Sequence, residues 1–303
     1  MLNTKIEETV WKEMQKVNFP IDIEKIDGIP PEMGRKLIRT DVGRPLGIVK
    51  SKYKPILHKD AFEGALQEMI NGGLTLDNAQ IEIDSYEHGA MAKMEVLLPE
   101  KQIMIGDHKL YLKYVARNSY NGRWKFQSFF GWLNEVCFNT LVTGQKLAYT
   151  SNRHTKSFDI DQSNKKIQNA IIAVTDETER FKHWWDKIVY DEQIKNLFET
   201  TIAKQHLSKG SRIAGISETN KKQLAILMGL YHEEVTQIHG KGDYGRNDAK
   251  GSLWCAYQSA TAWSTHLSDI NKDNTKKYLI QAERQKQVID MIETSKWKEL
   301  ENA

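Results

Sequence analysis

The chain has 303 residues, 40% of them hydrophobic and 27% charged, and a formal net charge of only +3, which is typical of a globular protein with one large or two modest domains. Its two cysteines, Cys137 and Cys255, form no CxxC pair, which excludes a zinc ribbon. No stretch approaches the ~20 apolar residues of a membrane span and the N-terminus has no apolar signal segment, so we expect a cytoplasmic protein with no membrane partner.

The first 45 residues are predicted to form an N-terminal helix and an extended arm. Apolar residues fall at helical spacing within residues 1–19. The stretch from 19 to 56 carries five of the six prolines, which favour extended chain with short edge strands over a packed helix. Residues 47–56 alternate loosely and could form a first strand.

Residues 46–160 are predicted to form a β-rich core, in which a helix at 58–71 comes first. Alternating apolar residues then predict strands at 79–86, 91–98, 110–117 and 123–130. Pro99 is expected to end the second of these strands. Asn121-Gly122 is the strongest hairpin turn signal in the chain, so the four strands are predicted to form an antiparallel meander. An apolar stripe at i, i+3, i+4 and i+8 predicts a short helix at 132–143.

The second half of the chain, residues 161–303, is predicted to be helical. Helices are predicted at 162–206, 218–239, 252–267 and 275–301. The third is apolar over much of its surface, so we expect it to be central. The glycine-rich stretch 239–247 lacks the residue order of a P-loop and is interpreted as a connection. The predicted fold class is α+β: an antiparallel β-meander packed on helices, followed by a largely helical half that shares its core.

Charge is unevenly distributed along the sequence. Residues 60–100 carry a net charge of −8, and residues 101–158 carry +7. Such a polarised layout suggests a head-to-tail homo-oligomer, in which the acidic face of one subunit meets the basic face of the next. The same contact could cover the basic face and prevent it from binding another partner.

Basic and aromatic side chains alternate on the last two predicted strands and recur after the helix. Cationic side chains bind phosphates in a salt-dependent way, and aromatic rings stack on unpaired bases. The candidate nucleic-acid-binding residues are Lys113, Arg117, Tyr120, Arg123, Trp124, Lys125, Arg153 and Lys156. The cations would contact phosphates, and the two aromatic residues would stack or shape the groove. A solvated sheet face with its aromatic residues in the core is an equally open alternative.

The sequence contains no catalytic motif. The nine histidines are scattered and form no HExxH-type pair. Glu82 and Asp84 share a strand face, but they could bind a divalent ion only if a third carboxylate such as Glu95 converged on them. We therefore predict no catalytic residue, no metal site and no cofactor, and we expect the chain not to be an enzyme.

Four stretches of the sequence carry a family resemblance. They are GIVKSKYKPILHKDAFE (47–63), FGWLNEVCFNTLVTG (130–144), NRHTKSF (152–158) and GSLWCAYQSATAWSTHLSD (251–269). They resemble the phage/plasmid-like proteins of domain-of-unknown-function family 932 over roughly residues 40–270. The family usually has an arginine shortly before its cysteine, and this chain has Trp132-Leu133-Asn134-Glu135 there. The resemblance implies a phage, prophage or plasmid setting in a bacterial host, with no established activity.

A weaker similarity concerns topology alone. A β-meander packed on a helix, with basic and aromatic residues on its strands, is similar to the core of the single-strand annealing proteins of phage recombination. The leading hypothesis is therefore a single-stranded DNA-binding protein of a phage or mobile element, with strand annealing as a role it could serve. The alternatives are a phage accessory protein that binds a host protein and a metal-dependent nuclease.

Overall fold

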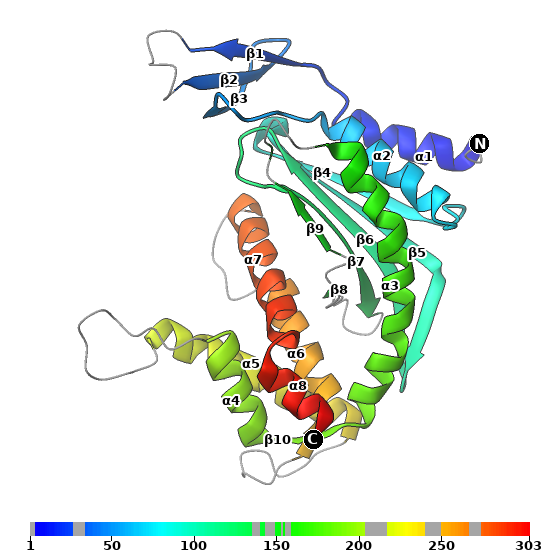
Figure 1. Ribbon diagram of the computed structural model, residues 1–303, viewed down its shortest axis with the longest axis vertical. Helices are drawn as coiled ribbons and strands as arrows, with labels where there is room; N and C mark the ends of the chain where they lie inside the picture. The colour runs from blue at the N-terminus through cyan, green and yellow to red at the C-terminus, as the bar shows by residue number, and fades with distance from the viewer. Residues whose placement is uncertain are drawn as a thin grey trace. The chain divides into compact units, whose positions relative to one another are not determined.

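The computed structural model describes residues 4–26, 34–134, 140–142, 149–152, 154, 159–203, 217–239, 250–266 and 274–303. Within these residues the protein is α+β, as predicted, with antiparallel strands mainly in the first half and helices dominating the second (Figure 1). The chain divides into two compact units. Unit 1 comprises Met1–Gln102, Tyr111–Gly131 and Gln145–Thr175, and unit 2 comprises Ile103–Leu110, Trp132–Gly144 and Asp176–Ala303. The three-part division expected from the sequence stays a prediction.

In unit 1, the stretch predicted to be extended chain with short edge strands contains a three-stranded antiparallel sheet (Figure 1). Its strands are β1 (Ile21–Lys25), β2 (Arg35–Thr40) and β3 (Pro45–Lys50). The turn from β2 to β3 contains Gly43 at φ +83°, a backbone conformation that favours glycine. On one face, Ile38, Leu46 and Val49 are buried against Tyr120. This burial fixes the small sheet to the rest of unit 1.

A six-stranded sheet follows helices α1 (Thr4–Gln15) and α2 (His58–Asn71). Its strands are β4 (Gln80–Tyr86), β5 (Met91–Ile105), β6 (His108–Ser119), β7 (Phe126–Asn134), β8 (Thr140–Val142) and β9 (Tyr149–Asn152), with the short 3-10 helix η2 (Glu87–Gly89) after β4. The order is β4-β5-β6-β7-β8, and β9 also pairs with β7. The meander predicted from the turn signals is confirmed.

Two predictions about this sheet are wrong. Pro99 does not end a strand, because β5 continues to Ile105. Since β4 pairs with β5 only from Met91 to Leu97, the missing N–H of Pro99 removes no bond from that ladder. The helix predicted at 132–143 is also wrong where the structure describes it: Trp132–Asn134 belong to β7 and Thr140–Val142 form β8.

Unit 2 is mainly helical. Its elements are the second part of α3 (Ile160–Asp186), β10 (Ile188–Tyr190), α4 (Asp191–Thr201), α5 (Glu218–His239), β11 (Lys250–Ser252), α6 (Leu253–Thr265), α7 (Asn274–Ile292) and α8 (Ser295–Asn302). The single helix predicted at 162–206 is interrupted by β10, which pairs with β11. Helix α6 packs against α5 and α7 and is buried over almost its whole length, so its predicted central position is confirmed.

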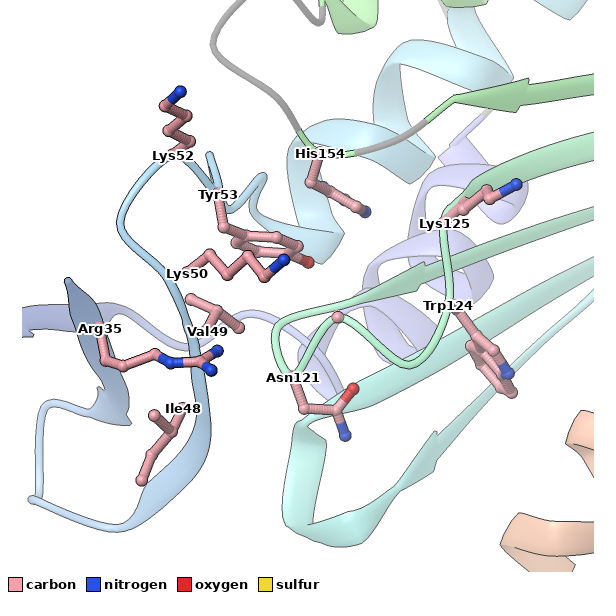
Figure 2. A pocket seen from close by; sticks show the side chains of 11 residues that line it. Arg35, Ile48, Val49, Lys50, Lys52, Tyr53, Asn121, Trp124, Lys125 and His154 are labelled. Carbon is pink, nitrogen blue, oxygen red and sulfur yellow. The ribbon is translucent and has the colours of Figure 1, made fainter. Parts of the chain in front are cut away.

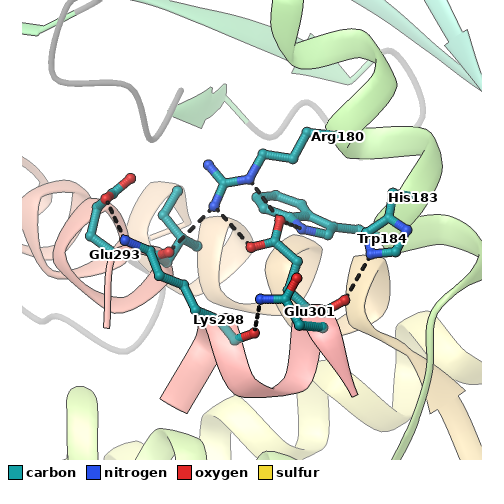
Figure 3. A network of polar contacts seen from close by, with 8 residues as sticks. Arg180, His183, Trp184, Glu293, Lys298 and Glu301 are labelled. Atoms are coloured by element: carbon teal, nitrogen blue, oxygen red, sulfur yellow. Dashed lines mark hydrogen bonds and ion pairs between the residues drawn. The ribbon is translucent and has the colours of Figure 1, made fainter. Parts of the chain in front are cut away.

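The last helix is fixed to α3 by a polar network (Figure 3). Glu301 accepts hydrogen bonds from Arg180 Nε at 2.8 Å and from Trp184 Nε1 at 2.7 Å, and its backbone oxygen lies 2.8 Å from His183 Nε2. The Arg180 guanidinium also lies 4.7 Å from the centre of the Trp184 ring. Burial alone would raise the pKa of Glu301, but the hydrogen bonds and charge of Arg180 hold it below its ordinary value. The last residues of the chain therefore contribute to the stability of unit 2.

Candidate nucleic-acid interface

A pocket of about 430 Å³ lies in unit 1, lined by β3, the chain that follows it and the turn from β6 to β7 (Figure 2). Among the described residues, four cations and three rings line it, and none of the described lining residues is acidic. The cations are Arg35, Lys50, Lys52 and Lys125, and the rings are Tyr53, Trp124 and His154. We call it the basic pocket. A concave site with this lining favours an anionic ligand that also carries an apolar or aromatic part.

The four cations of the basic pocket are exposed, and no acid that the structure describes is paired with them. Arg35 and Lys50 are direct partners in the register of β2 and β3. Like charges directly opposite one another destabilise a sheet. Within the described ranges of the chain, no ion pair joins any of the four cations to an acid. A bound anion would remove this repulsion.

Two rings of the pocket form a stack. The rings of Tyr53 and His154 have centroids 4.9 Å apart and an interplanar angle of 28°. The Tyr53 hydroxyl donates to the Ser119 backbone oxygen at 2.5 Å, which fixes the ring against the end of β6. Burial lowers the pKa of His154 to about 4 and raises that of Tyr53. Both rings are therefore uncharged near neutral pH, and the positive charge of the pocket comes from lysine and arginine alone.

The turn from β6 to β7 is held tightly against β3. A Cβ atom added to Gly47 would lie 2.7 Å from both Cα and Cβ of Asn121, so glycine is needed for this approach. Asn121 Nδ2 donates to Glu87 at 2.7 Å, and the Arg123 guanidinium forms an ion pair with the same carboxylate. The Ser119 hydroxyl bonds to the backbone oxygen of Trp124 at 2.9 Å. The wall of the basic pocket is therefore rigidly placed.

A buried histidine supports the pocket from within unit 1. His58 Nδ1 accepts a hydrogen bond from Asn118 Nδ2 at 2.9 Å, and its Nε2 lies 3.0 Å from the backbone oxygen of Gly89. Its backbone N–H donates to the Tyr120 hydroxyl at 2.9 Å. Burial lowers the pKa of His58 to about 3, so the ring is neutral and serves packing.

The structure brings two of the eight predicted site residues together in the basic pocket. Lys125 is an exposed lining residue, whereas Trp124 lines the pocket but is only 3% exposed. Arg153 and Lys156 lie outside the described residues, although His154 between them lines the pocket. The β6–β7 turn and His154, which carry or adjoin predicted site residues, therefore line the same pocket.

The other four predicted residues are not among the residues that line the pocket. Tyr120 is fully buried and Arg117 is 3% exposed, with its guanidinium 5.8 Å from the centre of the Phe129 ring. Lys113 pairs with Glu95 at 3.2 Å, and Arg123 pairs with Glu87, as described above. Part of the basic block is thus neutralised by the acidic block of the same chain.

Sequence reasoning missed Arg35, Lys50 and Lys52. The signal for the last two was the segment Lys50-Ser51-Lys52-Tyr53-Lys54, in which lysines alternate around an aromatic residue. No pattern in the sequence indicated Arg35, because its position opposite Lys50 depends on the register of β2 and β3.

Two of the three acids of the nuclease alternative, Asp84 and Glu95, are paired with lysines. Lys93 pairs with both Asp84 and Glu95 at 3.3 Å, and Lys113 pairs with Glu95. Burial alone would raise the pKa of Glu95, but the two lysines hold it below its ordinary value. No group of three or more histidine, cysteine, aspartate or glutamate side chains that could hold a metal is found among the residues described above.

Comparison with known proteins gives one match. The family model described as "Domain of unknown function (DUF932)" matches residues 45–289. The chain belongs to this family. The family match confirms the resemblance seen in the sequence, and no curated protein and no solved structure matches the chain. The matched region of this DUF932 protein includes every cation of the basic pocket except Arg35.

Over the part of the chain that the structure describes, no helix has the length and apolar character that a membrane span requires.

Proposed function

We propose that this DUF932 protein binds single-stranded DNA through the basic pocket. The observation that carries the proposal is a pocket lined by four exposed cations, with no described acid paired to them, that also holds the Tyr53–His154 stack. The cations supply a salt-dependent hold on the phosphate backbone, and the rings suit unpaired bases. Bases of a duplex are stacked on one another and do not offer their faces, so single strands are the better ligand.

The proposal includes a biological setting and a role. The protein would serve a phage or other mobile element in the cytoplasm of its bacterial host, where single strands arise in replication and recombination. Strand annealing needs no cofactor, because base pairing supplies the driving force. Mixing two complementary labelled strands with the protein would test this role once binding is measured.

The experiment is a titration of labelled single-stranded and double-stranded oligonucleotides, followed by fluorescence anisotropy at about 50 mM and about 200 mM salt. We expect binding that is tighter for the single strand and weakens steeply with salt. The absence of salt-sensitive binding at low micromolar protein would refute the proposal. Degradation of the oligonucleotide in the presence of Mg²⁺ would favour the nuclease alternative instead.

Two variants with the same change of net charge make the test specific. The pocket variant combines Lys50→Gln, Lys52→Gln and Lys125→Gln. The control variant combines Lys165→Gln, Lys166→Gln and Lys222→Gln, which are exposed lysines outside the pocket lining. We expect the pocket variant to lose most of its affinity and the control variant to keep it.

The head-to-tail oligomer stays a separate proposal. The pairs Arg123–Glu87 and Lys113–Glu95 join the basic and acidic blocks within one chain, which leaves less complementary charge for a second copy. Light scattering over a range of protein concentrations would test the oligomer, and a strict monomer throughout would contradict it.

A further inference from the structure

We infer that the basic pocket holds one nucleotide unit, with a phosphate bound by Arg35 and Lys50 and a base against the ring of Tyr53. The ligand class is a nucleoside phosphate, whether free or as part of a strand. The inference rests on the proposed function and goes further by naming which part of the nucleic acid enters the pocket. It also assigns Arg35, which lies outside the matched family region, a direct role in binding.

The phosphate site follows from the register of β2 and β3. Because Arg35 and Lys50 are direct cross-strand partners, their side chains leave the same face of the sheet at neighbouring positions. Figure 2 shows the guanidinium of Arg35 and the ammonium of Lys50 pointing in the direction of the β6–β7 turn, while Lys52 points away from it. Arginine offers phosphate two parallel N–H donors and lysine adds a compact charge. Together they can neutralise a free phosphate monoester, which carries about −1.5 to −2 at neutral pH, or the single charge of a phosphate within a strand.

The base site follows from how Tyr53 is held. His154 covers one face of its ring, and the hydroxyl bond to Ser119 fixes the ring plane. Tyr53 also packs against the buried cluster that contains Val49 and Tyr120, so it is the part of the ring that lines the pocket that is offered to a base. A ring that is already fixed loses little conformational entropy when a base stacks on it. Neither Tyr53 nor His154 is charged near neutral pH, which suits the apolar face of a base.

The size of the pocket limits how much ligand it can hold. Its volume of about 430 Å³ lies in the lower part of the range of small-molecule sites. This is room for a single nucleotide rather than for a base pair with its backbone. The pocket would therefore select a strand whose bases are unpaired, or a free nucleotide.

The test is isothermal titration calorimetry of the full chain with thymidine monophosphate, inorganic phosphate and thymidine. We expect the nucleotide to bind in the millimolar to micromolar range, about tenfold more tightly than phosphate. Only the nucleotide can both form ion pairs through its phosphate and stack its base on Tyr53. Arg35→Gln should weaken the binding of nucleotide and phosphate alike, by about tenfold or more. Tyr53→Leu should still bind phosphate, which would show that the pocket is folded. Its affinity for the nucleotide should fall to that for phosphate.

Competition with a labelled single-stranded oligonucleotide then separates the sources of the ligand. Displacement of the oligonucleotide by the monophosphate supports a nucleotide of the strand as the occupant. Nucleotide binding without any oligonucleotide binding supports a free nucleotide and refutes the proposed function alone. Salt-sensitive oligonucleotide binding with no nucleotide binding overturns the inference while the proposed function stands, and equal affinity for phosphate and nucleotide overturns the base site.

Discussion

Replacing Lys50 by glutamate should stabilise the fold of this DUF932 protein while weakening its binding of anions. In the wild-type protein Lys50 faces Arg35 across β2 and β3, and none of the described acids pairs with either side chain. Two like charges in this position oppose the pairing of the strands. A residue that destabilises the fold in this way is expected where a ligand is bound.

The size of the effect can be worked from the register. A directly opposed like-charge pair costs about 0.2–1 kcal/mol, and an opposite-charge pair gains a similar amount. Lys50→Glu both removes the repulsion and adds an attraction to Arg35, so the free energy of unfolding should rise by about 1 kcal/mol. Lys50→Gln only removes the repulsion and should raise it by about half as much. In about 1 M salt, where the Debye length is near 3 Å, both gains should vanish.

Urea unfolding at low and high salt measures these differences, with Lys52→Glu as the matched control. Lys52 lines the same pocket but lies beyond the last residue of β3 and has no cross-strand partner among the residues that the structure describes. Its substitution changes the charge of the pocket equally, yet it should change the unfolding free energy by no more than about 0.5 kcal/mol. Added phosphate should stabilise the wild-type protein and have little effect on Lys50→Glu, because binding to the native state stabilises it by mass action.

A loss of stability in Lys50→Glu would refute the reasoning. It would mean that the side chain of Lys50 contributes to the fold through contacts that outweigh its repulsion with Arg35. A gain that persists unchanged in high salt would show that the effect is not electrostatic.

Three further predictions concern stability. Because burial lowers the pKa of His58 from 6.5 to about 3, the stability that its neutral ring provides is lost as pH falls below about 6.5. The contribution of His58 to the unfolding free energy should drop by about 2 kcal/mol between about pH 7 and pH 5, so the pH-dependent loss in a His58→Asn variant should be smaller than in the wild type by about this amount, and a variant that keeps the wild-type difference would contradict this. Gly47→Ala should cost about 1–3 kcal/mol in denaturant unfolding, since its Cβ would collide with the β6–β7 turn, whereas Gly229→Ala in α5, with open space around it, should be neutral or stabilising. Glu301→Gln should lower the stability of unit 2 by about 1–3 kcal/mol in thermal unfolding, because Arg180 keeps its charge without a paired carboxylate, and a change below about 0.5 kcal/mol would contradict the role of this network.

The sequence predicted those parts of the fold that depend on local signals. Strict alternation and the turns at Gly106 and Asn121-Gly122 were enough for the meander, since each strand pairs with its neighbour in the chain. The helix expected at 132–143 failed for a physical reason. Phe129, Phe130 and Trp132 are all buried, so β7 has an apolar run that fits a helix and a fully buried strand equally well.

The candidate site was predictable only in part. Composition indicated a basic and aromatic surface, and it found Trp124 and Lys125 at the β6–β7 turn. Which cations remain without an acid depends on register: Lys113 is neutralised because it lies near Glu95 on the neighbouring strand, whereas Lys50 faces Arg35. Neither partner can be read from spacing along the chain, because strand register is a tertiary property.

The central claim is that the basic pocket binds the phosphates of single-stranded DNA, and the salt dependence of binding tests it most directly. The observable is the slope of log affinity against log salt for a single-stranded oligonucleotide. Each phosphate contact contributes about 0.7 to this slope, so the pocket variant, which lacks three cations, should have a slope shallower by about 2 than the wild type. The control variant should keep the wild-type slope. Equal slopes for the wild type and the pocket variant would contradict the account.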